Sequence, residues 1–301
     1  MLYSFRLVSD ELKNWHTVRL NDGRRIYELI ARPGQSEHVY MNLPVSRRPK
    51  IEVPFPCTVE ELSFGESDYM SPEQTHLNTA LDSETGIPFR RGARGDPRHL
   101  VVTFPHFKGQ GGWPAPYTVL NAESVGINDC AFLSFQDPHF HLGSYLLSDN
   151  HGHDPKPSVE RTIRNELERF SLDDSSLTIL GASKGAATAV MMSEYFTANQ
   201  LIVCSLSTNL DIPIRKSRYS HIGVALDYYG VSYPDMMECL LAEAAKKETH
   251  WFYAVGDHAS NQGNESATAD RLTSYPVESG HSQVLRESMT TINRIIGERM
   301  A

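Results

Sequence analysis

A serine between two glycines is the feature of this sequence with the clearest chemical use. Gly181-Ala182-Ser183-Lys184-Gly185 matches the pattern G-x-S-x-G, between the apolar run Leu177–Leu180 and an alanine-rich stretch over 186–196. A serine on a sharp strand-to-helix turn needs small neighbours, and the glycines meet that need. Such a turn places the hydroxyl at a helix N-terminus, which favours developing negative charge. The pattern predicts a nucleophilic serine; the alternative is a glycine-rich turn whose serine is incidental.

A base and an acid must accompany this serine, because a hydroxyl is a poor nucleophile until its proton is removed. Proteins with this turn carry the three residues in the order serine, acid, histidine. Asp257 follows the apolar run Trp251–Val255, and His281 lies between another apolar run and the last helical stretch. The sequence therefore predicts Ser183, Asp257 and His281 as a catalytic triad.

Two alternatives to this assignment stay open. Asp211 also follows an apolar run and could supply the carboxylate. His258 is adjacent to Asp257, but neighbouring side chains on extended chain point to opposite faces, so we expect His258 at the rim of the site.

Two backbone N–H groups are expected to form an oxyanion hole. One is that of Lys184, directly after the nucleophile. The second should come from the loop after the strand-like segment His99–Phe104, from His106 or Phe107. The Lys184 amine is expected to face solvent or a neighbouring carboxylate.

Histidine and aspartate residues cluster after the apolar run Cys130–Phe135. They are Asp137, His139, His141, Asp149, His151, His153 and Asp154. Two H-x-H pairs with acids could bind a metal, but no spacing matches a known zinc motif such as H-E-x-x-H. We predict a lid or a pocket wall here, with no metal and no cofactor.

The elements that would position these residues alternate between strand and helix from residue 98 onward. The expected strands are His99–Phe104, Cys130–Phe135, Leu177–Leu180, Leu201–Ser207, Trp251–Val255 and Leu272–Val277. The expected helices are Tyr117–Val125, Ser158–Phe170 with Ser158 as N-cap, Gly185–Thr197, Pro234–Lys247 and Ser282–Met300. This alternation predicts an α/β fold with a mostly parallel sheet and helices on both faces.

The first 95 residues have a different character. Short strand-like segments over 15–20, 25–31, 39–45 and 51–55 are separated by turn residues such as Asn21-Asp22-Gly23. The sequence predicts a small β-rich N-terminal domain over 1–95, a linker over 90–97, and an α/β-hydrolase-like catalytic domain over 96–301.

Two motifs together resemble a known family. Gly181–Gly185 and the upstream Gly143-Ser144-Tyr145-Leu146 resemble serine α/β-hydrolase-like proteins of bacterial accessory secretion systems and of capsular-polysaccharide biosynthesis (the XcbB/CpsF kind). Those proteins carry G-x-S-K-G and G-S-Y-Y, whereas this chain has Leu146 at the last position of the second motif. The resemblance covers roughly residues 95–301 and implies an α/β-hydrolase fold.

Composition excludes several function classes. The chain has 301 residues and a formal net charge of −9, with only short basic clusters, which argues against a nucleic-acid partner. No apolar stretch approaches the roughly 18 residues of a membrane span, and the N-terminus lacks a signal-peptide pattern. Four cysteines without a CxxC pair fit a reducing compartment, so we expect a cytoplasmic protein.

The expected function is acyl-enzyme chemistry on an ester, thioester or amide. An acyltransferase acting on a carbohydrate or other hydroxyl, and a non-catalytic subunit of a secretion or biosynthetic assembly, are the alternatives. The expected partner is a small-molecule or acylated substrate, and a homo-oligomer stays open.

Overall fold

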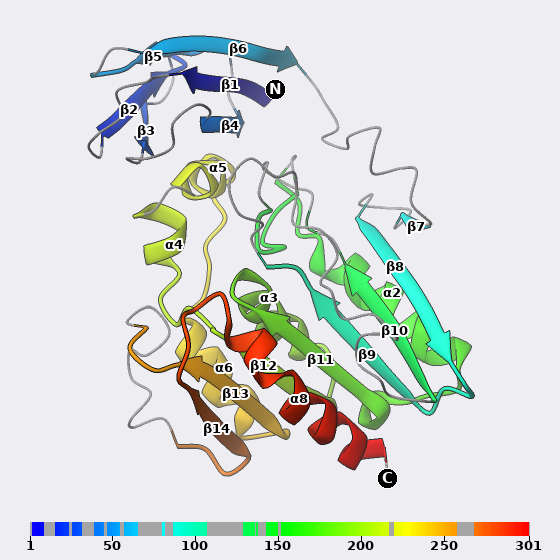
Figure 1. Cartoon of the computed structure of the whole chain (residues 1–301). Coiled ribbons are helices and arrows are strands. Elements are labelled where there is room, and N and C mark those ends of the chain that lie inside the picture. Colours follow the sequence, from blue (N-terminus) through cyan, green and yellow to red (C-terminus); the bar gives the residue numbers. More distant parts are fainter. Residues whose placement is uncertain are drawn as a thin grey trace.

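The large sheet contains eight strands and carries most of the chain's core (Figure 1). The computed structural model describes residues 2–8, 16–23, 26–31, 39–44, 47–54, 57–65, 80–81, 87–106, 129–135, 137, 143–149, 152–216, 220–257 and 268–300. The strand order is β14-β13-β12-β11-β9-β10-β8-β7. The strands are β7 (Ala80–Leu81), β8 (Pro88–Arg94), β9 (His99–Phe104), β10 (Cys130–Phe135), β11 (Leu177–Ala182), β12 (Gln200–Cys204), β13 (Thr249–Ala254) and β14 (Leu272–Val277).

The strands from β14 to β10 in this order are all parallel, whereas β8 runs antiparallel to β10 and β7 antiparallel to β8. All residues of β9, β10, β11 and β12 are buried. Continuous apolar runs are typical of parallel strands that are covered on both faces. The carboxyl-terminal ends of β11, β13 and β14 lead into the segments that carry Ser183, Asp257 and His281.

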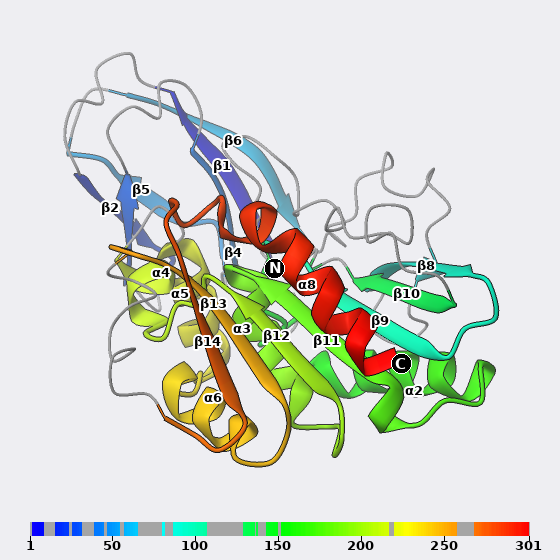
Figure 2. The ribbon, with the colours of Figure 1, turned by 60° about the horizontal axis from the view of Figure 1, so that its bottom comes forward.

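Helices cover both faces of the sheet. On one face lies α8 (Val284–Met300), as Figure 2 shows. Its Ile292 and Ile296 belong to a core that includes Leu180 and Phe252. On the other face lie α2 (Lys156–Arg169), α3 (Lys184–Ser193) and α6 (Met236–Ala244), whose apolar side chains share a core with Ile179. The α/β class and the mostly parallel sheet with helices on both faces are confirmed.

Several predicted bounds match the structure and others need correction. The strands β9, β10 and β14 have the predicted bounds. Helix α2 begins earlier than predicted, with Pro155 rather than Ser158 as its N-cap, because Pro157 fits the first turn of a helix. The helices α4 (Asp211–Arg215) and α5 (Ser220–Tyr229) were not predicted. The predicted helix over 117–125 lies outside the described residues.

The N-terminal region contains two three-stranded antiparallel sheets, β4-β1-β6 and β3-β2-β5. The strands are β1 (Leu2–Val8), β2 (His16–Asn21), β3 (Ile26–Ala31), β4 (Val39–Pro44), β5 (Lys50–Glu52) and β6 (Thr58–Gly65). The β-rich character is confirmed. Of these strands β3 and β4 contact α5, and the region lies at the end of the large sheet toward which β9 and β11 point (Figure 1).

The interpretation of residues 90–97 as a linker is wrong. Residues 88–94 form β8, and six of them pair with β10 in the large sheet, Phe89 with Phe135 and Arg94 with Cys130. The arginines and glycine that suggested a linker belong to a strand near the sheet edge, where exposed charges are tolerated. The division of the chain into two domains at residues 95 and 96 stays a prediction.

The described part of the chain contains no helix that is long and apolar enough to cross a membrane. Cys130 and Cys204 are buried in the central strands, as the sequence predicted, and burial raises the pKa of both thiols.

Candidate active site

The serine turn joins β11 directly to α3. Ser183 has φ 53° and ψ −117°, a left-handed conformation that costs a non-glycine residue about 1–3 kcal/mol. Its N–H donates to the carbonyl oxygen of Cys204 at 2.8 Å, so the pairing between β11 and β12 continues into the turn. The strain is therefore held by the sheet, and the hydroxyl stands at the first turn of α3.

Both glycines of the motif are required by close backbone contacts. A Cβ on Gly181 would lie 2.0 Å from the carbonyl oxygen of Gly185, and a Cβ on Gly185 would lie 2.3 Å from that of Phe104. Neither backbone atom can move without distorting the sheet or the helix. The sequence-based explanation of the motif, that small residues permit the turn, is therefore correct, and the contact with Phe104 adds the end of β9 to it.

The three predicted triad side chains meet in the structure. His281 Nε2 lies 2.9 Å from Ser183 Oγ, and His281 Nδ1 lies 2.5 Å from Asp257 Oδ2. Each side chain follows the end of a different strand, so residues that are 24 and 98 positions apart in the chain become neighbours through the parallel topology. The His281 side chain is one-third exposed and that of Asp257 is 17% exposed, so the imidazole remains accessible to a substrate.

Ser205 supports the histidine and was not identified from the sequence. Its hydroxyl donates to the backbone carbonyl of His281 at 2.8 Å, and its N–H donates to Phe252 at 2.8 Å. Ser205 has φ 51°, directly after β12. Nothing in the local sequence distinguishes it from any serine at a strand end.

The alternative acid, Asp211, does not reach the histidine. It lies at the start of α4, where it accepts a hydrogen bond from the Tyr233 hydroxyl and pairs with Arg215 at 3.4 Å. Asp257 rather than Asp211 is therefore the partner of His281. His258 lies outside the described residues.

Two of the three predicted oxyanion donors, Lys184 and His106, are among the described residues, and both lie near the turn that carries Ser183. Lys184 is the first residue of α3, and the contacts of Gly185 with Phe104 and Pro105 place the end of β9 beside it. His106 follows two residues after β9, and burial lowers its pKa, assisted by the positive charge of Lys184. Phe107 lies outside the described residues. The roles of Lys184, His106 and Phe107 in an oxyanion hole remain predictions.

The Lys184 amine faces a carboxylate rather than solvent. Its Nζ lies 2.7 Å from Asp137 Oδ2, and both side chains are buried, at 0% and 1% exposure. Asp137 Oδ1 in turn accepts the backbone N–H of Ser144 at 3.0 Å. The sequence had placed Asp137 in the His/Asp cluster, so its partnership with the serine turn was missed.

Other described members of the His/Asp cluster make local contacts. Asp149 accepts the backbone N–H of His153 at 2.8 Å and pairs with its ring at 3.1 Å, while Asp154 pairs with Lys156 at 2.7 Å. Among the described residues no three His, Cys, Asp or Glu side chains converge as metal ligands do. His139, His141 and His151 lie outside the described residues, and the absence of a metal stays a prediction.

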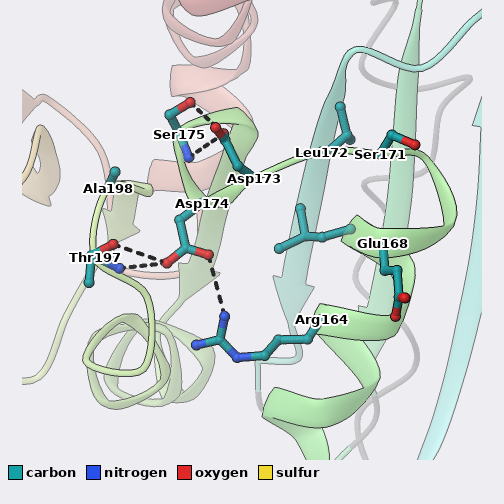
Figure 3. A pocket seen from close by; sticks show the side chains of 10 residues that line it. Arg164, Glu168, Ser171, Leu172, Asp173, Asp174, Ser175, Thr197 and Ala198 are labelled. Atoms are coloured by element: carbon teal, nitrogen blue, oxygen red, sulfur yellow. Dashed lines mark hydrogen bonds and ion pairs between the residues drawn. The ribbon is translucent and has the colours of Figure 1, made fainter.

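Two open depressions in the described part of the chain lie at the opposite end of the sheet from Ser183. One, of about 740 Å³, is lined by the end of α2 and by η2 (Asp174–Ser176). Figure 3 shows that the Asp174 carboxylate there contacts Thr197 and Arg164, so both of its oxygens already have partners within the protein. The other, of about 410 Å³, adjoins it. Neither is near the triad, and we do not regard either as the substrate site.

Comparison with known proteins gives fold-level matches. No family model matches the chain, and no curated protein matches it by sequence. The capsule O-acetyltransferase of Neisseria meningitidis serogroup A, in complex with caged gadolinium, is similar with a TM-score of 0.54 and 17% identity, covering 70% of this chain and 95% of that chain. A histidine-to-alanine mutant of that enzyme in complex with CoA gives a TM-score of 0.51, with the same identity and coverage.

The Glycosylation Associate Protein complex from Streptococcus agalactiae aligns with 11% identity over 99% of this chain and 63% of that chain, with a TM-score of 0.48. Strand order, the serine turn and the two matches to the capsule O-acetyltransferase agree: the chain has the α/β-hydrolase fold.

Proposed function

We propose that this chain of α/β-hydrolase fold is a serine hydrolase that forms an acyl-enzyme on Ser183, from an ester, a thioester or an amide. The observation that carries the proposal is the hydrogen-bonded series from Ser183 through His281 to Asp257. A strained serine, an imidazole base and a carboxylate in this arrangement activate a hydroxyl as a nucleophile.

In the first half of the reaction Ser183 Oγ bonds to the acyl carbon and its proton passes to His281 Nε2. Asp257, on Nδ1, keeps the ring in the correct tautomer and stabilises the imidazolium. The negative charge on the former carbonyl oxygen is met by the N–H of Lys184 and by an N–H of His106 or Phe107. The intermediate collapses, the bond to the leaving group breaks, and the leaving group takes the proton from His281.

In the second half a water molecule gives its proton to His281 and bonds to the acyl carbon. The second oxyanion collapses, the bond to Ser183 Oγ breaks, and His281 returns the proton to Ser183. The products are the free acid and the original enzyme. Each proton is therefore carried by one residue, which lies within hydrogen-bond distance of the nucleophile.

A second candidate is acyl transfer to a hydroxyl of a carbohydrate or of another acceptor. It is favoured by the structural matches with TM-scores above 0.5, which are all to a capsule O-acetyltransferase, in one case with CoA bound. The acyl-Ser183 intermediate is common to both reactions, and only the acceptor of the acyl group differs. Exclusion of water from the acyl-enzyme decides between them.

The test begins with a fluorophosphonate probe, followed by peptide mass spectrometry. The proposal expects one adduct, on Ser183. Acetyl-CoA and p-nitrophenyl acetate are then supplied with and without a polyhydroxyl acceptor, and free acetate and acetylated acceptor are measured. Free acetate alone supports the hydrolase, acetylated acceptor supports the transferase, and absence of any adduct in folded protein favours a non-catalytic subunit.

A further inference from the structure

The ion pair between Lys184 and Asp137 lies directly behind the serine turn. Two charges that are 0% and 1% exposed lose the solvation of water, and an ion pair so buried often contributes no net stability compared with apolar residues of the same size. Burial lowers the pKa of Lys184, and Asp137 opposes that shift. Stability therefore does not by itself explain why charges are placed here.

The position of Lys184 on α3 makes its charge still less expected. It is the first residue of the helix, where the backbone dipole is already positive and where no acidic side chain belongs to the first turn. A cation at this end is unfavourable for the helix, so the carboxylate that balances it has to come from elsewhere. It comes from Asp137, two residues beyond β10.

Asp137 also holds the loop over 143–149 against the serine turn. One carboxylate oxygen accepts the Ser144 N–H and the other accepts from Lys184. A Cβ on Gly143 would lie 2.1 Å from Lys184 Nζ and 2.5 Å from Asp137 Oδ2, so only glycine leaves room for the ion pair. The two sequence motifs, Gly143–Leu146 and Gly181–Gly185, therefore meet at this carboxylate.

The loop itself is strained and needs such an anchor. Gly143, Tyr145 and Leu146 have φ of 94°, 62° and 54°, and all three are buried. Left-handed conformations at non-glycine residues persist only where the surroundings hold them. The carbonyl oxygen of Tyr145 accepts the hydroxyl of Thr188, one turn along α3, at 3.2 Å. The loop is therefore fastened to α3 at two points, and the ion pair is the one beside Ser183.

We propose that Asp137 and the side chain of Lys184 are positioning residues, which fix the first turn of α3, and with it the Lys184 N–H, relative to Ser183. This inference rests on the proposed function, because the N–H that is positioned is the expected oxyanion donor. The positive charge of Lys184 is also felt at His106, on the side of the second expected donor. The pair thus connects the serine turn, the loop after β10 and the loop after β9.

The test compares this pair with an equally buried pair from the end of α6 and the segment after it, which contacts the C-terminal end of α3. Lys247 Nζ lies 2.6 Å from Glu243 Oε2, with exposures of 3% and 2%. Asp137→Asn and Lys184→Met, which keep approximate shape and remove charge, are compared with Glu243→Gln and Lys247→Met. The readouts are kcat and KM for p-nitrophenyl acetate, and hydrogen–deuterium exchange of peptides covering 143–149 and 183–188.

Asp137→Asn and Lys184→Met should lower kcat by about 10²-fold with KM changed by less than about 3-fold, because a small misplacement at the reacting centre has effects of this size. Exchange over 143–149 and 183–188 should become faster in both. Glu243→Gln and Lys247→Met should leave kcat of the folded protein and exchange in those peptides unchanged.

Folded Asp137→Asn and Lys184→Met proteins with the wild-type kcat and exchange would overturn the inference. It is also overturned if both fail to fold while the two controls fold, since the pair would then be a requirement of folding. If the wild type itself neither hydrolyses the ester nor takes the fluorophosphonate, the proposed function fails. In that case hydrogen–deuterium exchange still shows whether the ion pair between Asp137 and Lys184 fixes the serine turn.

Discussion

Lysine side chains are buried at both ends of helix α3, each with a carboxylate beside it. At the C-terminal end Lys247 Nζ donates to the carbonyl oxygens of Ser193 and Phe196, at 2.7 and 2.6 Å. A cation there adds a donor to carbonyls at and beyond the end of the helix and agrees with the helix dipole. At the N-terminal end Lys184 opposes the dipole and is balanced by Asp137.

This difference between Lys247 and Lys184 suggests that the C-terminal end of α3 serves stability, whereas the N-terminal end serves the proposed reaction. Lys247 differs from Lys184 in that it also donates to two backbone carbonyl oxygens at an end of the helix where a cation agrees with the dipole, so folding accounts for its position. The N-terminal end combines a strained serine, a charge in an unfavourable place and a loop with left-handed residues. Residues and backbone conformations that lower stability are expected at functional sites. Changes at the two ends should therefore separate activity from stability.

The largest expected effect is the loss of activity on removing the nucleophile. Ser183→Ala should lower kcat/KM for ester hydrolysis by about 10⁴–10⁶-fold, and His281→Ala by a similar factor, because nucleophile and base act as a unit. The midpoint of urea unfolding should not fall, because the alanine side chain loses only the contact of the hydroxyl with His281. Probe labelling of the Ser183→Ala protein at another residue would show that the nucleophile had been misassigned.

The next effect distinguishes the two candidate acids. Asp257→Asn should lower kcat by about 10²–10⁴-fold, because an amide on Nδ1 no longer stabilises the imidazolium. Asp211→Asn should change kcat little, since that carboxylate contacts Tyr233 and Arg215 at the start of α4. Steady-state kinetics of both variants measures the contrast. Equal losses in the two variants would contradict the assignment.

The sequence was most informative where a single local rule decided the outcome. The apolar runs of β9, β10 and β14 gave the strand bounds, and the glycines around Ser183 indicated the turn. The order serine, acid, histidine then identified side chains that meet in space. These features depend on hydrophobic periodicity and on steric limits of the backbone, which any sequence displays directly.

Features that depend on pairing between distant segments could not be predicted. The strand β8 looked like a linker because its arginines are polar, and only its pairing with β10 makes it a strand. Asp137 and Lys184 are 47 positions apart, and no local pattern connects them. The hydrogen bond from Ser205 to His281 likewise arises from the order of β12, β13 and β14 in the sheet.

Removing the lysine at the C-terminal end of α3 should affect stability alone. Lys247→Met removes the closer of the two lysines that pair with the buried Glu243 carboxylate and takes that donor from the carbonyls of Ser193 and Phe196, so we expect the free energy of unfolding to fall by about 3 kcal/mol. Glu243→Gln should cost less, because the ammonium keeps its three oxygen acceptors. Urea titration gives both values, and kcat of the folded fraction serves as the control. A lower kcat in folded Lys247→Met or Glu243→Gln protein would contradict the distinction between the two ends of α3.

The smallest effect concerns a buried histidine at the amino-terminal end of the sheet and its response to pH. His99 Nε2 lies 2.8 Å from the Thr178 hydroxyl, which itself donates to Gln200 Oε1 at 3.0 Å. Since that hydroxyl has only one hydrogen, His99 donates to it through Nε2. Burial, and secondarily the charge of Arg299, lowers the pKa of His99 to about 4.

A histidine whose pKa is lower in the folded than in the unfolded chain binds protons preferentially when unfolded. Its contribution to stability is therefore complete above pH 6.5 and is lost as the pH falls from 6.5 to about 4, by about 3 kcal/mol in total. Burial also lowers the pKa of His106 and His250, so the wild type should lose more than this. His99→Gln retains a donor for Thr178 but does not titrate. The free energy of unfolding, measured at pH 7 and pH 4, should therefore fall about 3 kcal/mol less in His99→Gln than in the wild type, with kcat at pH 7 unchanged. An identical fall in both proteins would show that His99 does not titrate as proposed.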